Sequence, residues 1–467
     1  MDKVLKYAGH LRMEIPIFLY MLSSFIKFPV FQNLAYEKIC YQHYHDDVLC
    51  SNASAYYKDK SIQAEANHFI FASSMILTLP SIISTLILGA VSDNRSIKIP
   101  LLLPYIGLVF ASLNYIIQGI LLHANANYML ISDAIFGACG GYICIISTTL
   151  TYGVKTTRLQ HRSYRIAGVE GAIGLGGTLG YVLSGTIREA FGYAYTFLFI
   201  LILISIAFFY VLILAKEEVR IREDNSIGFC SSILSYIRKI ICDFYFVLTK
   251  PRAFRNILAL NLIGLGCELF IFAGLMDIQF SYMRYKLGWG DKAYGWFSGL
   301  SYGLTTFAIL VLYPFLRSKG VTDGILGCAG MATKIVSLIM LAFLKSEAMA
   351  YSIAVVTILN RFVSTGFRVF ISSLLETDEQ GKIFSVISLL DGVTSLCATS
   401  MYNMVYPKTL DFFPGFLFLL SAALLIFPII VLFISDRTVH YHRLEVDSHS
   451  SDEAPPSPTP AETSSTM

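Results

Sequence analysis

Long apolar stretches follow one another along almost the whole chain, and short polar connections separate nearly all of them. Each stretch holds twenty-odd residues and is apolar on nearly every helical face, whereas a helix of a soluble protein buries one face only. A helix needs about 20 such residues to cross the hydrocarbon of a bilayer. The pattern predicts twelve membrane-spanning helices, at residues 13–34, 67–92, 99–122, 127–153, 165–187, 191–215, 254–278, 292–316, 323–345, 348–373, 383–406 and 411–435.

The composition supports a membrane protein. The chain is 55% hydrophobic and 14% charged, whereas soluble proteins average about 25% charged residues. This excludes an ordinary soluble α/β protein and predicts an all-α fold surrounded by lipid bilayer. The net charge is only +3, so nothing indicates a nucleic-acid partner.

The longest internal connection divides the spans into six plus six. Two such halves, with the substrate path between them, are typical of one class of transporters, although another kind of polytopic protein remains an alternative. The tail is rich in Ser, Pro, Thr and acidic residues, which is typical of disorder. The predicted organisation is a cytoplasmic N-terminus at residues 1–12, a six-helix half at 13–215, a cytoplasmic linker at 216–253, a second half at 254–435 and a disordered cytoplasmic tail at 436–467.

Lysine and arginine predict the orientation of the spans. They gather before span 1 and in the connections that follow spans 2, 4, 6 and 8, all on one side, so both termini are expected in the cytoplasm. The connection at residues 35–66 falls on the other side and carries Asn52 in a glycosylation sequon, which is usable only there. Cys40 and Cys50 share this oxidising connection and could close a local disulfide.

Between spans 2 and 3, a small residue, Gly89, is followed by the acidic Asp93 and the basic Arg95 and Lys98. The segment resembles the signature of the major facilitator superfamily, in which a small residue allows close helix approach and an acid–base pair latches the cytoplasmic face. Asp93 would accept charge-assisted hydrogen bonds and face the N-terminus of a neighbouring helix. The alternative is a solvated turn that only maintains the topology.

The fifth span contains several closely spaced glycines, among them Gly176, Gly177 and Gly180. The four-residue spacing from Gly176 to Gly180 gives the small-residue face that close helix contact needs. We interpret this face as a hinge surface between moving halves. Packing for fit alone is the other interpretation, and the two do not exclude each other.

Several separated segments resemble solute carrier family 46, the family of the proton-coupled folate transporter. The likeness runs from about residue 14 to residue 434. It implies a twelve-helix major facilitator fold and secondary transport driven by protons. The segments that carry it lie at residues 36–40, 165–177, 187–193, 375–384, 402–410 and 413–422.

Ionisable residues inside the spans are expected to serve function, because burying a charge is costly unless it faces water or a partner. Glu170 lies about one turn inside span 5 and matches the glutamate that the resemblance associates with proton coupling. A salt bridge to Arg162 or Arg165 is the structural alternative. Leu275 stands where the resemblance expects a span 7 histidine, and nearby Asp277 is the second candidate proton carrier.

Two arginines of span 10 are candidates for binding an anionic substrate. Arg361 and Arg368 are seven residues apart and therefore share one helical face. A guanidinium can hold a carboxylate through two hydrogen bonds, and the resemblance places Arg368 at the substrate. Asp391 completes this candidate set, although Asp391 or Glu268 could instead pair with either arginine for structure.

The chain also departs from the family pattern. Asp133 replaces an expected arginine in span 4, Gly141 replaces an acidic residue, and Lys27 appears where span 1 is usually neutral. Ser96 and Ile97 replace the usual glycine and arginine of the latch. The substrate class therefore stays open among a folate, a muropeptide, a cyclic dinucleotide and a steroid conjugate.

No metal-ligand cluster, phosphate-binding glycine loop or nucleophile–base set is recognisable in the sequence, so neither an enzyme nor a cofactor other than the proton gradient is expected. The function predicted is proton-coupled symport of a small organic anion by alternating access, at the plasma membrane or in endolysosomes. A non-transporting receptor or scaffold, or a lipid-handling protein, is the alternative. Residues Tyr441 to Leu444 fit a signal for a sorting adaptor.

Overall fold

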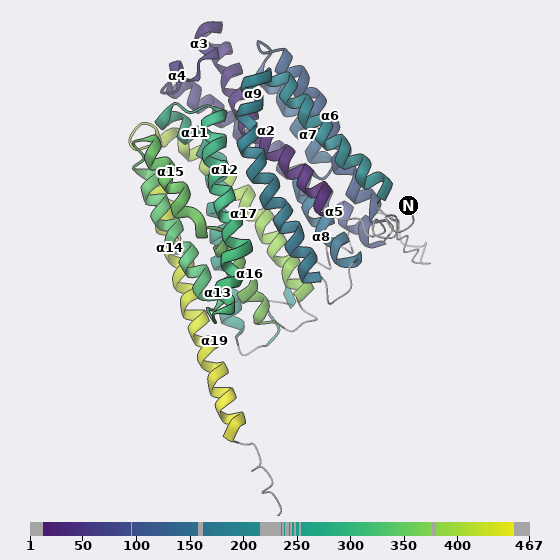
Figure 1. Cartoon of the computed structure of the whole chain (residues 1–467), viewed down its shortest axis with the longest axis vertical. Helices are drawn as coiled ribbons and strands as arrows, with labels where there is room; N and C mark the ends of the chain where they lie inside the picture. The colour runs from purple at the N-terminus through teal and green to yellow at the C-terminus, as the bar shows by residue number, and fades with distance from the viewer. Residues whose placement is uncertain are drawn as a thin grey trace, which may run out of the picture.

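The computed structural model describes residues 13–94, 96–156, 162–214, 254–375 and 380–452, with isolated positions between 235 and 251. Every regular element within these residues is helical. Figure 1 shows long helices side by side in one bundle, with the short helices α3 and α4 at one end. Arg95, residues 1–12, most of residues 216–253 and the tail beyond 452 lie outside the described residues.

The first half contains spans 1 to 6. Span 4 is broken where Gly140 and Gly141 take positive φ values of 109° and 58°, and spans 5 and 6 form one element bent at Gly192, with φ 79°. Such values suit glycine, which has no Cβ to clash. The elements are α2 (Glu14–Tyr44), α3 (Asp47–Ser51), α4 (Ala53–Tyr56), α5 (Lys60–Asn94), α6 (Lys98–Ile120), η1 (Ala126–Met129), α7 (Leu130–Ala138), α8 (Gly141–Thr156) and α9 (Arg162–Leu214).

The second half contains spans 7 to 12, and three of these spans are assembled from consecutive helical pieces. Span 8 passes through a π-helical segment, η3, and span 10 through a 3₁₀ turn, η4. The elements are α11 (Arg255–Leu287), α12 (Asp291–Phe307), η3 (Ala308–Leu312), α13 (Tyr313–Ser318), α14 (Asp323–Ala342), α15 (Glu347–Val356), η4 (Thr357–Leu359), α16 (Arg361–Ser373), α17 (Gln380–Thr409), α18 (Phe416–Leu424) and α19 (Ile426–Asp452).

Each predicted span coincides with a helix or with consecutive helical pieces, but several helices are longer than the apolar stretches. Helix α2 continues to Tyr44 and α11 to Leu287, and each ends at a residue in the left-handed conformation, His45 and Gly288. Helix α19 continues to Asp452, beyond the predicted end of span 12 at residue 435. Helix propagation is inexpensive once a helix exists.

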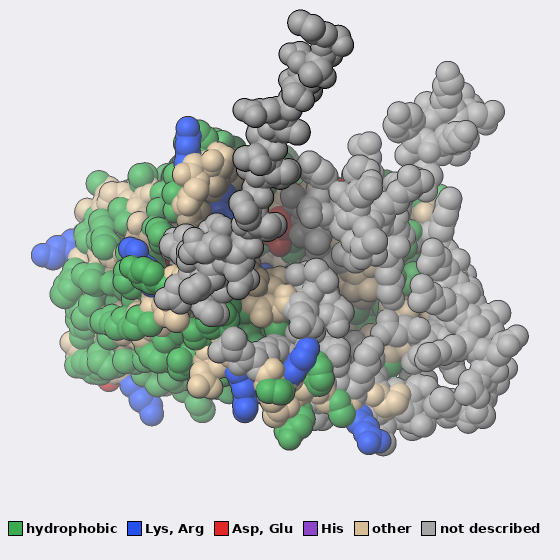
Figure 2. Space-filling model, turned by 90° about the horizontal axis from the view of Figure 1, so that it is seen from below, with side chains coloured by type: hydrophobic (Ala, Val, Ile, Leu, Met, Phe, Trp, Pro, Cys, Tyr) green, Lys and Arg blue, Asp and Glu red, His purple; other side chains and the backbone are tan. Residues whose placement is uncertain are grey.

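The halves contact each other mainly through α9 with α12 and α5 with α17, and also through α2 with α12 and α5 with α11. Large apolar side chains remain exposed on the outer flanks of the bundle, among them Ile83, Phe110 and Phe209. Such surfaces are suited to lipid rather than water. Figure 2 shows the bundle from the end opposite α3 and α4, with hydrophobic side chains on its flank and Lys and Arg side chains along its edge.

One end of the bundle carries the predicted sequon, and we call it the Asn52 end. Cys40 of α2 and Cys50 of α3 form a disulfide there. Buried Lys38 donates to the carbonyl oxygens of Leu121 at 2.6 Å and Ala124 at 3.3 Å, just beyond the last turn of α6. A cation at a helix C-terminus satisfies carbonyls that lack a partner in the helix. These contacts fix α2 to its neighbours at this end.

Close packing of α2 on α9 depends on two of the predicted hinge glycines. A Cβ at Gly176 would lie 2.8 Å from the Phe18 carbonyl oxygen, and one at Gly180 would lie 2.7 Å from that of Leu22. Both glycines therefore serve contact within the first half. Gly177 instead faces Tyr302 of α12, across the two halves.

The glycine contact gives a stability prediction. Gly180→Ala should lower the melting temperature of the purified protein, because the new methyl must displace backbone, at a cost of about 1–3 kcal/mol. Gly171→Ala is the matched control on the same helix, since its Cβ would meet only the Leu310 methyl groups at 3.8 and 4.0 Å. This control should be neutral or stabilising by up to ~1 kcal/mol. Equal melting temperatures for the two variants would contradict the packing.

Candidate functional site

A cavity lies between the helices of the first half and α11 of the second. Its empty space, counted out to its open mouth, is about 1000 Å³. Helix α2 supplies one wall from Tyr20 to Gln32, and Asp277 reaches the cavity from the second half. Ligand sites are typically concave and apolar with a few polar groups, and this one fits that description. Its aromatic and aliphatic wall includes Phe28, Phe31, Phe136, Phe197, Ile200 and Ile204.

A lysine and an aspartate face each other in the cavity. Lys27 Nζ of α2 lies 3.5 Å from Asp133 Oδ1 of α7, and the Lys27 side chain is 21% exposed against 1% for Asp133. The Asp133 carboxylate accepts hydrogen bonds from Tyr115 at 2.6 Å and Ser73 at 2.7 Å. The sequence marked both residues only as departures from a family pattern. The structure brings them together as the charged centre of the cavity.

Asp277, a predicted proton carrier, is part of the same cavity wall. Asn403 of α17 donates to Asp277 Oδ2 at 3.0 Å. Tyr142 of α8, also in the wall, interacts electrostatically with both Asp277 and Asp391. Asp277 is therefore held by the second half while it faces groups of the first half.

Glu170, the other predicted proton carrier, does not line this cavity. It is an exposed residue of α9 and interacts electrostatically with Tyr302 of α12. The Arg361 guanidinium lies over the Tyr302 ring, 4.4 Å from its centroid. Glu170 of the first half and Arg361 of the second half therefore share Tyr302 as a neighbour. The side chains of Arg162 and Arg165, the alternative partners, lie outside the described ones.

The second predicted arginine, Arg368, is half-buried on α16, and its Nε has no hydrogen-bond partner among the described residues. It interacts electrostatically with Asp391, which is exposed. Glu268, the proposed structural partner, is instead paired with Lys334 at 2.9 Å, and both side chains are buried. Among the described residues, no carboxylate forms an ion pair with Arg368, whereas one would be expected for a purely structural arginine.

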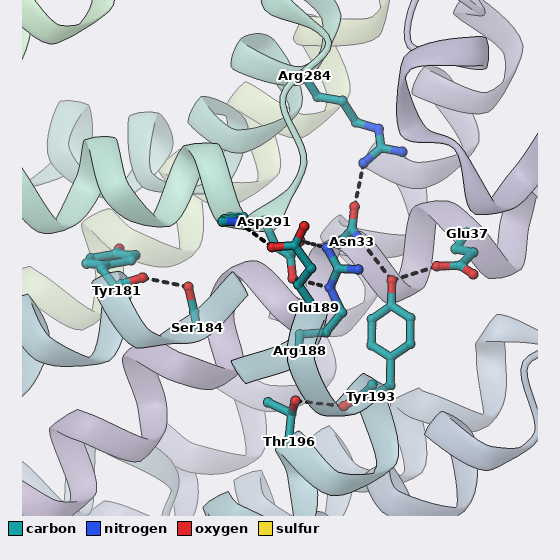
Figure 3. Close-up of polar contacts among 12 residues, drawn as sticks. Asn33, Glu37, Tyr181, Ser184, Arg188, Glu189, Tyr193, Thr196, Arg284 and Asp291 are labelled. Carbon is teal, nitrogen blue, oxygen red and sulfur yellow. Dashed lines mark hydrogen bonds and ion pairs between the residues drawn. The ribbon is translucent and has the colours of Figure 1, made fainter. Parts of the chain in front are cut away.

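Charged contacts close the Asn52 end between the two halves, and we call the Arg188–Asp291 and Arg284 contacts the gate. Arg188 of α9 donates to both carboxylate oxygens of Asp291, the first residue of α12, with Nε at 2.7 Å from Oδ2. Asp291 is fully buried. Figure 3 shows this pair beside Asn33 and Tyr193. A buried, two-bond Arg–carboxylate pair has the geometry of the strong ion pairs in proteins.

Arg284 of α11 forms the second part of the gate. Its guanidinium donates to Asn33 Oδ1 and to the Tyr56 hydroxyl, both at 2.7 Å, and lies 4.6 Å from the Tyr36 ring centroid. Asn33 in turn donates to Tyr193, whose hydroxyl donates to Glu37 (Figure 3). A cation of the second half is thus enclosed by polar and aromatic groups of the first half.

Sequence reasoning did not find the gate. Arg188, Arg284 and Asp291 lie outside the predicted spans, where charges are ordinary, and Arg188 and Asp291 are 103 residues apart. One signal was present: Asp291 stands at the first turn of its helix, a position that favours an acidic residue. Only the packing of the two halves identifies its partner.

The remaining predicted positions are partly described. Gly89 is half-buried in α5, Lys98 begins α6, and Asp93 lies in the last turn of α5 without a described side chain. Asn52 is exposed at the end of α3. Tyr441 is 62% exposed on α19.

Comparison with known proteins identifies the family. The model of the Major Facilitator Superfamily matches residues 17–399. A lysosomal proton-coupled steroid conjugate and bile acid symporter from Gallus gallus is 25% identical over 451 residues, which are 90% of this chain and 93% of the relative. A proton-coupled folate transporter from Rattus norvegicus is 25% identical over 398 residues, 83% of either chain.

Solved structures share the fold at lower sequence identity. A D-xylose-proton symporter aligns with a TM-score of 0.65 and 12% identity, covering 92% of this chain and 97% of that one. A human organic anion transporter aligns with a TM-score of 0.62 and 14% identity, covering 90% and 99%. The predicted twelve-helix fold is confirmed, and its family consists of transporters rather than enzymes. The chain belongs to the major facilitator superfamily and is a distant relative of the proton-coupled transporters of solute carrier family 46.

Proposed function

We propose that this secondary transporter couples proton movement to the symport of an organic anion by alternating access. One observation carries the proposal: the cavity that holds Lys27 and Asp133 of the first half also reaches Asp277 of the second half. A site that both halves reach is what rocking of those halves can expose to either side in turn. Relatives named for steroid conjugates, bile acids and folate support an organic anion as the solute.

The charges in the cavity give a reason for proton coupling. Lys27 is one cation facing two carboxylates, Asp133 and Asp277, so an arriving anion meets a wall with an excess of negative charge. A proton on Asp277 removes that excess, and the proton and the anion then favour each other's binding. Such coupling is reciprocal by linkage. Glu170 is the second proton carrier, and it acts where Tyr302 and Arg361 meet α9.

We infer that the Asn52 end faces the lumen or the cell exterior and that the structure is closed on that side. The gate supports closure there. At the opposite end, the segment of Gly89, Asp93, Arg95 and Lys98 would latch the cytoplasmic face when the gate opens. Arg361, Arg368 and Asp391 form the continuation of the substrate path into the second half, and Tyr441 to Leu444 would direct sorting to the plasma membrane or endolysosomes.

Uptake into expressing cells, with acidic and with neutral medium, tests proton coupling. Estrone sulfate and folate uptake should be faster at acidic pH. Asp277→Asn should reduce net uptake at least about tenfold, because an amide at position 277 can no longer bind and release a proton. Exchange of external for internal solute should persist, since exchange needs no proton release. Glu170→Gln should also reduce the pH dependence.

Asp47→Asn is the control for these variants, because Asp47 is an exposed carboxylate outside the cavity and should leave uptake unchanged. Uptake that ignores pH and both variants would contradict coupling while leaving transport intact. Absence of uptake at either pH would favour the non-transporting receptor or scaffold.

A glycosylation assay tests the orientation. If the Asn52 end is lumenal, glycosidase treatment should increase the gel mobility of the wild type and should not change Asn52→Gln. Asn127 on η1 is also exposed at this end but is not in a sequon, so Asn127→Gln should behave as the wild type. A wild-type chain insensitive to the enzyme would contradict the orientation.

The gate gives a conformational prediction. Arg188→Gln leaves buried Asp291 without its cation, which costs about 3–5 kcal/mol in the closed form, so the Asn52 end should open. The readout is the labelling rate of Ser281→Cys, a buried α11 position, by a thiol reagent that cannot cross membranes.

The labelling rate of Ser281→Cys should rise at least about tenfold with Arg188→Gln. The labelling rate should return toward that of the wild-type gate in the double variant Arg188→Asp with Asp291→Arg, which exchanges the two charges. Lys292→Gln breaks the exposed pair of Lys292 with Glu189 beside the gate and serves as the matched control, because exposed pairs contribute less than about 1 kcal/mol. Equal labelling in all these backgrounds would contradict the gate.

A further inference from the structure

Lys27 has hydrogen-bonding capacity that the protein does not use. Its ammonium lies 3.5 Å from Asp133 Oδ1, whereas charge-assisted N–H···O bonds measure about 2.7–2.9 Å. Its other contacts among the described residues are the ring faces of Phe31 and Tyr115, at 5.1 and 4.8 Å from the centroids. An ammonium carries three donors. Lys27 therefore presents donors to the cavity that a ligand can take.

Asp133 does not depend on Lys27 for its hydrogen bonds. Tyr115 and Ser73 each donate to one of its oxygens, so both bonds remain when the lysine turns away. The second buried pair of the bundle is different: Lys334 lies 2.9 Å from Glu268 Oε1, and Glu268 Oε2 has no partner among the described residues. Separating Lys27 from Asp133 is therefore less costly than separating Lys334 from Glu268.

Two further polar atoms of α2 lack partners beside Lys27. Ser23 lies one turn before Lys27 and Gln32 just over one turn after it, and both line the cavity while their side chains are only 2% exposed. Ser23 Oγ and Gln32 Oε1 have no hydrogen-bond partner among the described residues. A buried polar atom without a partner costs about 1–3 kcal/mol. A ligand with a hydroxyl or amide group would recover that cost.

We propose that Lys27 binds the anionic group of the transported solute and that Asp133 is the counterion from which Lys27 turns when the solute arrives. This rests on the proposed function and specifies its substrate. The solute carries an acidic group at Lys27, a rigid apolar body against the aromatic wall, and a hydroxyl, amide or carbonyl group that reaches Ser23 or Gln32. Sulfated or carboxylated polycyclic compounds have this chemistry.

Direct binding to the purified full-length protein tests the proposal without a proton gradient. The probes are tritiated estrone sulfate, which is anionic, and tritiated estrone, which has the same rings and the same ketone without the sulfate. Lys27→Gln should weaken estrone sulfate binding about 10- to 100-fold, since a hydrogen bond to a charged group contributes about 1.5–3 kcal/mol. Estrone binding should change less than about threefold, and Lys27→Arg should restore most of the estrone sulfate affinity.

Lys334→Gln is the matched control. It removes a buried lysine that is paired with a carboxylate elsewhere in the bundle, so it should lower the melting temperature without changing the ratio of the two affinities. If Lys27→Gln does not fold, it shows no melting transition and binds neither ligand, and Lys27→Arg then provides the test. If the arginine variant folds but does not recover estrone sulfate binding, the proposal is overturned.

Other outcomes separate this proposal from the proposed function. A wild-type protein that binds estrone as tightly as estrone sulfate, or a Lys27→Gln variant with unchanged preference, overturns the role of Lys27 even if pH-dependent uptake is observed. Selective binding through Lys27 without uptake at any pH leaves the site standing and overturns transport.

Discussion

Hydrocarbon gives a charged side chain no partner, and this constraint arranges the interior of the bundle. Three solutions occur among the described residues. Glu268 is neutralised by a lysine at hydrogen-bond distance, and Arg284 is enclosed by amide, hydroxyl and aromatic groups. Lys27 is the third case, because its carboxylate partner is farther away and a cavity lies in front of it. A charge whose hydrogen bonds are all made within the protein serves structure, whereas a charge with unused hydrogen bonds is available to a ligand.

The sequence was sufficient for the architecture because the same constraint acts on every stretch of the chain separately. Apolar length alone located all twelve spans, and the division into halves followed from one long connection. Helix ends were predicted less well, since α2 and α11 extend beyond the apolar stretches and end where His45 and Gly288 turn the backbone. A membrane-spanning helix can extend into water at little cost, so hydropathy does not mark its end.

The candidate site was predictable only in part. Asp277 was found because a carboxylate inside a span is unusual in any context, and it does line the cavity. The contact of Lys27 with Asp133 depends on how two helices are rotated about their axes, which one sequence does not reveal. Arg188 and Asp291 were harder still, because each is unremarkable by itself and they meet only when the two halves close. Hydropathy carries no information about which residues of distant segments contact each other.

The bend at Gly192 has a mechanical consequence. It joins spans 5 and 6 within one helical element, without an intervening loop. Arg188 of the gate lies one turn before the bend, while Phe197 of the cavity wall follows it by a little more than one turn. A displacement of α12 that pulls on Arg188 therefore acts on a helix end that one glycine separates from this part of the cavity wall. The Asn52 end and the cavity wall thus share a single corner of backbone.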